Sequence, residues 1–391
     1  MKTRLKPRSN PDKVRHFVDF ADNHLCISKK SSTFAASEKR IVRVRGKKHI
    51  PFILIGLLAS IACLSAQPLR IVSYNVENLF HPKHDSVYLP NPNETDSILI
   101  EKDDWEWTPN GERRWSYTRY YRKIENIARV LTNIGEWDGV DVVGLQEVEN
   151  ALCIRRLCYT LRQGKYDFVH YESPDQRGID VAFIYKKNRI DTIRTRAIKV
   201  EPTSDSSLKG RELITRDILY VCAGVKNGEK EPQDTLHFFV CHLPSQRGGK
   251  AESEWKRQLA QQILQAAIDS IYAVEKDAKI IVMGDMNSEP KDDLQGMKNR
   301  MNVQRDNVQC TKGTHKYHGQ WSYLDQFYVS PAIDSLCTVD IYDAEWIQEP
   351  DEKYLGLKPK RTYNGFRYQK DGYSDHLPII LTLNTKQGSA R

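Results

Sequence analysis

Short apolar runs and helical spacings divide most of the chain into predicted strands and helices. Residues 69–76 combine Ile, Val and Tyr in a run that is typical of a strand. Between residues 118 and 134, apolar residues recur every three or four positions, and this spacing predicts an amphipathic helix that stops at Gly135. Residues 251–274 predict a second long helix. Further short apolar runs predict strands at 141–146, 179–185, 236–241, 279–283, 326–329 and 377–383.

Residues 81–118 show neither pattern. They are polar and contain four prolines, so we expect a long loop or insertion there. No Gly/Ser-rich or Pro-rich linker and no internal repeat follows residue 67, and the simplest organisation is one domain over residues 67–391. Because strands predominate and helices lie between some of them, the pattern favours sheet-on-sheet packing with helices outside.

Cationic and aromatic residues alternate near the end of this insertion. The alternating residues are Arg113, Arg114, Trp115, Tyr117, Arg119, Tyr120, Tyr121 and Arg122. A strip of this kind can bind phosphates and stack on bases. In the alternative interpretation, which we favour, three tryptophans form a small core for the insertion and the arginines pair with nearby carboxylates. The tryptophans are Trp105, Trp107 and Trp115, and the carboxylates belong to Asp103, Asp104 and Glu106.

The charge of the chain is unevenly distributed. Hydrophobic residues make up 39% and charged residues 28% of the 391 residues, which excludes a multi-span membrane protein and a disordered polyampholyte. The formal net charge is +8, yet residues 1–66 hold 14 Lys and Arg against 4 Asp and Glu, so the remainder has a net charge of −2. The basic pI therefore comes from the first 66 residues and does not indicate what residues 67–391 bind.

These first 66 residues have the order of a secretory signal. Four basic residues between 43 and 48 precede an uncharged apolar run from Ile50 to Leu69, and Ser65 and Ala66 are small residues at a suitable cleavage position. We therefore expect residues 1–66 to be a basic leader plus signal peptide, and the protein to be exported to the periplasm, the outer surface or the medium. The alternative is a membrane anchor, with membrane association through residues 50–69, because this run is just long enough to span the hydrocarbon layer.

Six cysteines follow residue 66: Cys153, Cys158, Cys222, Cys241, Cys310 and Cys337. An even number in an exported chain permits three disulfides, and none has the CxxC spacing of a zinc site. Because residues 67–391 are long enough to form a core without disulfides, buried free thiols are an equal alternative.

Residues with carboxylate, imidazole or amide ends stand at the ends of the predicted strands. They are Asn75, Glu77, Gln146, Glu147, His242, Asp285, Asn287, Asp325, Asp375 and His376. Each has an ordinary explanation when taken alone, such as a solvated strand edge or an Asx turn. Taken together, they predict a site with acid–base residues and the oxygen ligands that Mg²⁺ or Mn²⁺ prefers.

Five blocks of sequence around these residues resemble those of the endonuclease/exonuclease/phosphatase family. The blocks are 73–78 (SYNVEN), 144–147 (GLQE), 241–244 (CHLP), 284–287 (GDMN) and 374–378 (SDHLP), with 324–325 (LD) as a sixth. They occur in the family's order and span nearly all of residues 67–391. The resemblance implies an α/β fold, a four-layer α/β sandwich in which two packed mixed β-sheets are flanked by helices. It also implies hydrolysis of phosphoester bonds by a metal-dependent phosphoric ester hydrolase.

The resemblance further implies roles for individual residues. The metal ligands would be Glu147, Glu77 and Asp375, with Mg²⁺ or Mn²⁺ as the cofactor. The residues that activate water, hold the phosphate or protonate the leaving oxygen would be Asp285, Asn287, His242, His376 and its partner Asp325. Asn75 would hold Glu147 or the phosphate. Outside the blocks, Arg177 and Arg247 stand beside glycines and are candidates for phosphate contacts at the rim.

The leading interpretation is an exported, divalent-metal-dependent phosphodiesterase, a nuclease that acts on DNA or RNA. His242 and Ser245 stand where AP endonucleases carry Tyr and Asn, which argues against abasic-site repair. The alternatives are a phosphomonoesterase or a sphingomyelinase-like phospholipid hydrolase of the same fold, and a non-catalytic surface-binding module. Nucleic acid is thus the expected substrate, no protein partner is implied, and we expect a monomer.

Overall fold

The computed structural model describes residues 67–90, 97–162, 164–202, 213–226, 232, 234–290, 301–303 and 313–384. The chain divides into two units, Met1–Ala62 and Cys63–Arg391, and every described residue belongs to the second. The expected leader and signal peptide, residues 1–66, lie outside the described residues. Within the described ranges, no helix is long and apolar enough to cross a membrane.

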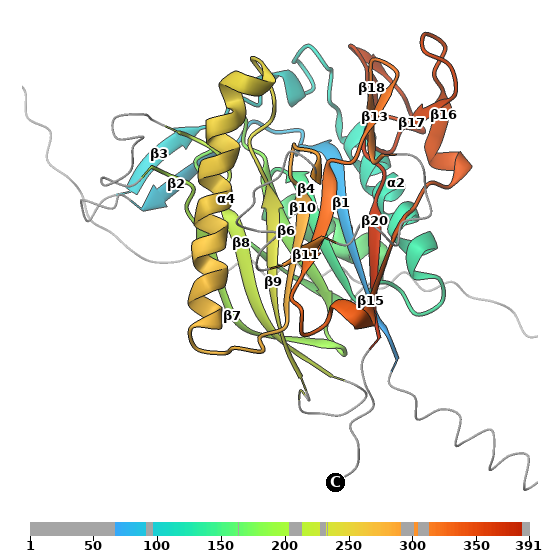
Figure 1. Ribbon diagram of the computed structural model, residues 1–391. Coiled ribbons are helices and arrows are strands. Elements are labelled where there is room, and N and C mark those ends of the chain that lie inside the picture. The colour runs from blue at the N-terminus through green and yellow to red at the C-terminus, as the bar shows by residue number, and fades with distance from the viewer. Residues whose placement is uncertain are drawn as a thin grey trace, which may run out of the picture. The chain divides into compact units, whose positions relative to one another are not determined.

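Two six-stranded mixed sheets form the centre of the second unit (Figure 1). The strand order of the first sheet is β15 (Cys337–Ile341), β20 (Ile379–Leu383), β1 (Leu69–Leu79), β4 (Val142–Val148), β6 (Asp180–Lys186) and β5 (Tyr166–His170). That of the second sheet is β11 (Asn302–Val303), β14 (Asp325–Val329), β10 (Ile280–Asp285), β9 (Asp234–His242), β8 (Ile218–Val225) and β7 (Ile190–Ile198). In each sheet one central pair is parallel, β1 with β4 and β9 with β10, and the other pairs are antiparallel.

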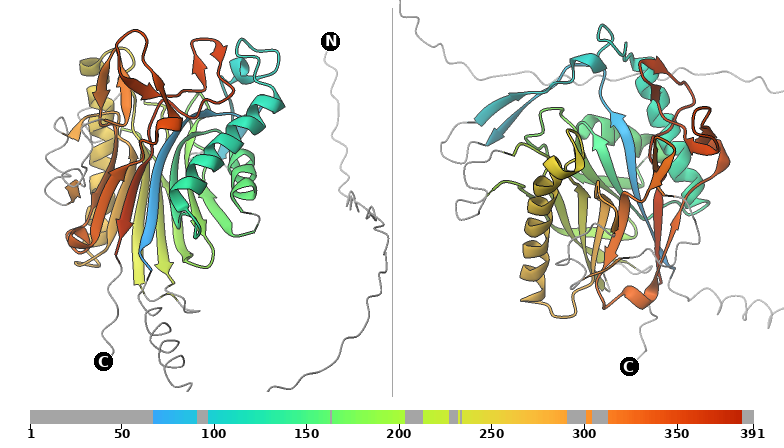
Figure 2. Two further views of the ribbon diagram at one scale, coloured as in Figure 1. Left: turned by 90° about the vertical axis from the view of Figure 1, so that its right-hand side faces the viewer. Right: turned by 45° about the horizontal axis from the view of Figure 1, so that its top comes forward.

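The two sheets pack face to face between helices. Along β10, Ile281 and Met283 point into the main core between the sheets, whereas Ile280 and Val282 join a second core against α4 (Lys250–Tyr272). The sheets approach closely at Gly144 of β4, where an added methyl group would lie 2.9 Å from the Met283 sulfur. Figure 2 shows α4 on one side of the strands and α2 (Tyr117–Gly135) on the other. The predicted four-layer α/β sandwich is therefore confirmed.

Each strand and long helix that the sequence predicts is present, with ends shifted by a few residues. The insertion, predicted as a loop, instead contains a hairpin and a short 3-10 helix: β2 (Ser86–Pro90), β3 (Ser97–Glu101) and η2 (Trp105–Trp107). Elements that the pattern did not predict are α3 (Ala151–Leu161), β5, β7, β8, β11, β15, and the 3-10 helices η4 (Asp334–Leu336) and η5 (Glu345–Ile347). So are three small hairpins: β12 (His315–Tyr317) with β13 (Gln320–Ser322), β16 (Gln348–Pro350) with β17 (Leu357–Pro359), and β18 (Tyr363–Asn364) with β19 (Arg367–Tyr368).

The cysteines favour the free-thiol alternative. Cys153, Cys158, Cys222, Cys241 and Cys337 are all buried and unpaired, and Cys310 lies outside the described residues. Burial raises the pKa of the Cys241 and Cys158 thiols, so both are inert neutral groups in the core at neutral pH.

The insertion has an aromatic core of its own. Trp107 and Trp115 are buried, Trp107 stacks on Phe80 with ring centroids 4.9 Å apart, and the Trp115 indole donates to the Phe80 carbonyl at 2.8 Å. Arg113 pairs with Glu106 at 3.1 Å and lies over the Trp107 ring. The small-core interpretation is thus confirmed for two tryptophans and wrong for the third, because Trp105 is 60% exposed.

Trp115→Ala is expected to lower the free energy of unfolding by about 3–5 kcal/mol, the usual cost of removing a fully buried tryptophan. The Phe80 carbonyl would also lose its indole donor. Chemical denaturation would measure the change. Trp105→Ala is the matched control, because this exposed ring should cost about 0.5 kcal/mol or less. Equal losses from the two substitutions would contradict the assignment of Trp115 to a core.

Candidate active site

The ends of strands from both sheets meet at one end of the sandwich. The parallel pairing of β1 with β4 sets Asn75 beside Gln146, and that of β9 with β10 sets His242 beside Asp285. The antiparallel neighbour β14 begins at this same end, with Asp325 paired to Asp285. Strands fix the position of side chains more firmly than loops do, so the predicted catalytic residues arrive on a rigid frame.

Backbone irregularities redirect the side chains of two predicted metal ligands, Glu77 and Glu147, at this end of the first sheet. The ladder between β1 and β4 shifts register after Asn75, and that between β4 and β6 shifts around Glu147. Glu77 and Glu147 have φ values of 54° and 63°, a left-handed conformation that costs a non-glycine residue free energy. Bulges of this kind redirect side chains next to active sites.

The Asp285 carboxylate is the meeting point of the predicted catalytic residues. Its Oδ2 accepts a hydrogen bond from the Asn75 amide at 3.0 Å and lies 3.7 Å from His242 Nε2 and 3.8 Å from His376 Nε2. Its Oδ1 accepts from the backbone N–H of Asn287 at 2.9 Å. Burial raises the pKa of Asp285 to about 7, although the His376 charge opposes the shift. A carboxylate poised near neutrality can take up a proton at physiological pH.

His376 and Asp325 form a buried pair, as the sequence predicted. The imidazole Nδ1 lies 2.7 Å from Asp325 Oδ2, and Asp325 is fully buried. Burial lowers the pKa of His376, but the Asp325 carboxylate outweighs it and holds the pKa well above its usual value. His376 is further fixed through Ser374, whose hydroxyl accepts from the His376 N–H and donates to the Asn75 carbonyl. The charged imidazole thus directs Nε2 towards Asp285.

The predicted metal ligands differ in how much of each carboxylate remains available. Glu147 accepts a hydrogen bond from the Asn78 N–H at Oε2, while its Oε1 lies 3.9 Å from His242 Nε2. Both oxygens of Glu77 are engaged, Oε1 by Arg361 Nε at 3.2 Å and Oε2 by the Thr362 N–H at 2.6 Å. Asp375 gives one oxygen to the other end of the Arg361 guanidinium, at 2.7 Å.

Burial and charge set the ionisation of these carboxylates. Burial raises the pKa of Glu147, and the neighbouring Asp375 raises it further. Burial also raises the pKa of Glu77. The pKa of Asp375 is lowered, because the Arg361 guanidinium outweighs the effect of burial. The Arg361 guanidinium therefore offsets the negative charge of Glu77 and Asp375, whereas Glu147 still experiences the charge of Asp375.

His242 is held as a neutral imidazole. Burial and then the nearby Arg216 and Arg177 lower the pKa of His242 well below its usual value. Its Nδ1 is buried and has no hydrogen-bond partner in the described part of the chain. Arg216 itself is buried, bonded to Asp175 at 2.9 Å and to the carbonyls of His242 and Leu243.

The predicted rim residues lie on the exposed side of this group. Arg177 is partly exposed and lies 3.7 Å from Asp175. Arg247 is exposed and close enough to lower the pKa of Arg177. Asn287 has a φ of 49°, and its amide donates to the Leu243 carbonyl at 2.9 Å.

Four residues of the site were not predicted from the sequence. Arg361, Arg216 and His315 lie outside the predicted strand ends, although the ring of His315 is 4.8 Å from that of His376. Lys123 is buried in α2, donates to the Tyr373 carbonyl at 2.6 Å and lies 3.9 Å from Glu77. Burial lowers the pKa of Lys123 to about 8. Lys123 lies next to Ile124 among the buried residues of α2. A lysine on the apolar face of a predicted helix is the sequence feature that could have indicated it.

Comparison with solved structures finds similar chains at low identity. A truncated TDP2 from Caenorhabditis elegans is 16% identical, with a TM-score of 0.50 over 82% of this chain and 99% of that one. An endonuclease/exonuclease/phosphatase family protein from Bacteroides thetaiotaomicron is 16% identical, with a TM-score of 0.49 over 82% and 100%. A mannosyl-6-phosphatase from the same species is 15% identical, with a TM-score of 0.47 over 80% and 98%.

No curated protein matches the sequence at a significant level. The sequence does match the Endonuclease/Exonuclease/phosphatase family over residues 70–385, a range that includes all the blocks of the predicted site. The chain therefore belongs to the Endonuclease/Exonuclease/phosphatase family.

Proposed function

We propose that the chain is an exported, divalent-metal-dependent phosphodiesterase, a nuclease that cleaves DNA or RNA. Members of its family are hydrolytic phosphoesterases. The observation that carries the proposal is the junction at Asp285, where Asn75, His242 and His376 all approach one carboxylate oxygen. Export is proposed from the signal-like order of charge and hydropathy in residues 1–66.

Two carboxylates of the site fit a divalent metal, which this family generally uses. Among the described residues, no hydrogen bond reaches Oε1 of Glu147 or Oδ1 of Asp375. These two residues would hold Mg²⁺ or Mn²⁺, because both ions prefer carboxylate oxygens. Glu77, with both oxygens engaged, would position Arg361 and Thr362 instead. Bound there, the metal would supply positive charge to the phosphate oxygens.

The residues around Asp285 supply the acid and the base. Asp285, with a pKa near 7, would accept a proton from the attacking water, held in place by Asn75 and the Asn287 N–H. His376 is charged and directs Nε2 into the site, so it would donate a hydrogen bond or a proton to a phosphate or leaving oxygen. Neutral His242 would contact the phosphate without adding charge. Arg177 and Arg247 would meet neighbouring phosphates at the rim.

Support for nucleic acid as the substrate comes from the rim and from part of the insertion. Arg113 and Arg119 lie over the rings of Trp107 and Tyr368 of the same chain. These two arginines are therefore engaged within the fold and do not form a surface strip for binding phosphates and bases. The exposed Trp105 remains, stacked on His84 with ring centroids 3.7 Å apart. An exposed ring of this kind offers a surface on which a base can stack.

A phospholipid is the second candidate substrate, because apolar side chains are exposed on three small hairpins. Tyr317 is 65% exposed at the end of β12, Leu355 is 79% exposed between β16 and β17, and Phe366 is 65% exposed between β18 and β19. The first of these hairpins starts at His315, which bridges to His376. Exposed apolar groups beside a site are typical of surfaces that contact lipid or protein.

A panel of phosphoesters tests the proposal. The purified chain would be assayed with single-stranded DNA, duplex DNA, RNA, bis-p-nitrophenyl phosphate, p-nitrophenyl phosphate and sphingomyelin vesicles, each with Mg²⁺, with Mn²⁺ and with excess EDTA. We expect cation-dependent cleavage of DNA or RNA, and Asp285→Asn purified in the same way controls for a contaminating nuclease. Preference for sphingomyelin would favour the second candidate. Hydrolysis of the monoester alone, or turnover in EDTA, would contradict the proposal.

A further inference from the structure

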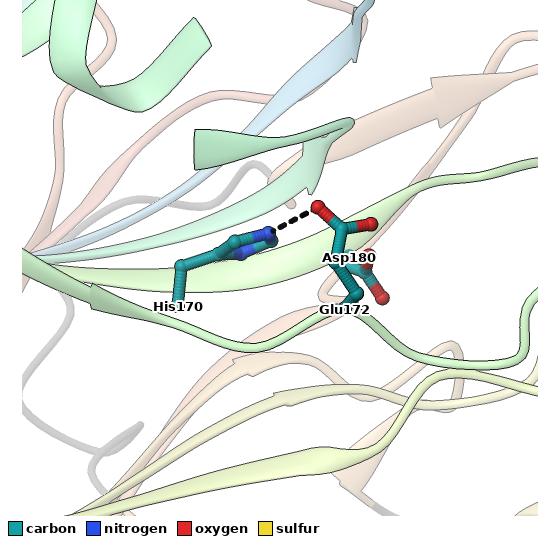
Figure 3. Close-up of side chains that lie close together, drawn as sticks. All are labelled: His170, Glu172 and Asp180. Atoms are coloured by element: carbon teal, nitrogen blue, oxygen red, sulfur yellow. Dashed lines mark hydrogen bonds and ion pairs between the residues drawn. The ribbon is translucent and has the colours of Figure 1, made fainter. Parts of the chain in front are cut away.

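A second group of potential metal ligands lies outside the site described above. His170 ends β5, Asp180 begins β6, and Glu172 lies in the loop between these strands. One ligand atom from each side chain lies within 4.8 Å of the other two (Figure 3). Within the described residues, no other group of three His, Cys, Asp or Glu side chains meets this condition. Its members share no side chain with the group around Asp285.

Each of the three side chains has one polar atom held by a neighbour. His170 Nδ1 lies 3.1 Å from the Val181 carbonyl and donates its proton to it. Glu172 Oε2 accepts from the Lys102 ammonium at 2.6 Å. Asp180 Oδ1 accepts a short hydrogen bond from the Ser173 hydroxyl. Metal-binding histidines and carboxylates are typically oriented in this way by partners behind them.

The remaining atoms are those that a metal would bind. His170 Nε2 lies 3.2 Å from Glu172 Oε1 and forms a hydrogen bond with it, so a metal bound here would take the place of the proton on Nε2. Two ligand atoms on one Zn²⁺ or Mn²⁺ stand about 3.0–3.4 Å apart when each bond is about 2.1 Å. Asp180 is 2% exposed, and its Oδ2 has no hydrogen-bond partner in the described part of the chain. An unpartnered buried carboxylate oxygen is costly unless a cation neutralises it.

We propose that His170, Glu172 and Asp180 form a second divalent-metal site that takes Zn²⁺ or Mn²⁺. An imidazole with two carboxylates suits these ions, whereas an all-oxygen set would suit Mg²⁺ or Ca²⁺. The two carboxylates carry two negative charges and Lys102 supplies one positive charge, so a bound dication would give the group a net charge of +1.

The position of the site gives the metal a structural role. Asp180 pairs with Val148, the residue that follows Glu147 in β4. Lys102 follows β3 of the insertion, and besides Glu172 it reaches the Glu149 carbonyl. A metal on the three ligands would therefore fasten the insertion, through Lys102, to the strand end that presents Glu147.

Metal binding to variants separates this site from the catalytic one. Metal-free Glu147→Gln would be titrated with Zn²⁺ alone and Mn²⁺ alone by calorimetry, and its thermal midpoint measured. We expect one bound ion per chain. We also expect the thermal midpoint to rise by a few degrees when the free metal concentration is about 100 times the Kd. Glu147→Gln with Asp180→Asn, which keeps the acceptor for Ser173, should lose both effects. Glu147→Gln with Glu275→Gln, whose carboxylate is exposed and faces His237, is the matched control and should keep them.

Two results would overturn the proposal. One is the absence of any bound ion in folded Glu147→Gln. The other is unchanged binding after Asp180→Asn or after His170→Ala, with folding checked by circular dichroism. Because Glu147→Gln removes the expected catalytic ligand, neither result depends on whether the chain hydrolyses phosphoesters.

Discussion

Glu147→Gln is expected to slow phosphoester hydrolysis about a thousandfold while leaving the thermal midpoint close to that of the wild type. A catalytic metal contributes several kcal/mol of transition-state stabilisation, and about 1.4 kcal/mol corresponds to a factor of ten in rate. A glutamine oxygen can still accept the hydrogen bond that the Asn78 N–H now gives to Glu147. The fold should therefore tolerate the change, and kcat measured with saturating Mn²⁺ would show the loss.

Glu149→Gln is the matched control for this substitution. Glu149 is buried two residues further along, and burial raises its pKa well above the usual range. Glutamine resembles the neutral form that this shift favours and can accept from the His81 N–H as Glu149 does. Its kcat should stay within a few-fold of the wild type. If Glu147→Gln kept nearly full kcat, the assignment of Glu147 as a metal ligand would be wrong.

Loss of His376 or of Asp325 is expected to reduce kcat by a factor on the order of 10²–10⁴, the usual effect of removing a positioned acid or base. The two losses should not add, because Asp325 acts through the imidazole that it holds at 2.7 Å. His376→Ala with Asp325→Ala should thus be scarcely slower than His376→Ala alone. The measurement is kcat for the single and double variants, each corrected for its folded fraction.

Substitutions at Asp325 are also expected to change the stability of the fold. Asp325→Ala leaves His376 buried without its partner, and a charge left alone in a core is strongly destabilising. Asp325→Asn keeps the shape of the side chain and removes the charge, so it separates lost folding from lost chemistry. Independent, multiplicative losses from the two single variants would reject the dyad. So would normal kcat in the folded fraction of Asp325→Asn.

The strands that carry the site could be predicted because each combines a short apolar run with a polar residue at its end. This holds for β1, β4, β9, β10 and β14, which bear most of the predicted residues. β7 was missed because its sequence, IDTIRTRAI, mixes charged and apolar residues on an edge strand. β5 and the His170 cluster were missed together, because the ligands come close only through the pairing of β5 with β6.

Side chains that reach the site from distant loops could not be predicted. Arg361 lies 284 residues from Glu77 in sequence and belongs to no apolar or polar pattern. Its contacts depend on where the loop between β17 and β18 lies, and loop positions follow from tertiary packing. The functional roles of the site residues remain predictions, since they rest on the family's blocks and on geometry.

The hydrogen bond from Asn75 to Asp285 joins residues 210 positions apart, one on each sheet. Neither sheet alone contains the catalytic group, so a folding intermediate with one sheet formed and the other undocked would be inactive. Recovery of activity during refolding should therefore coincide with the last step in which the sheets associate, later than the recovery of secondary structure. An activity assay would then report on completed folding, and two separately expressed halves of the chain would need to reassociate before any turnover appeared.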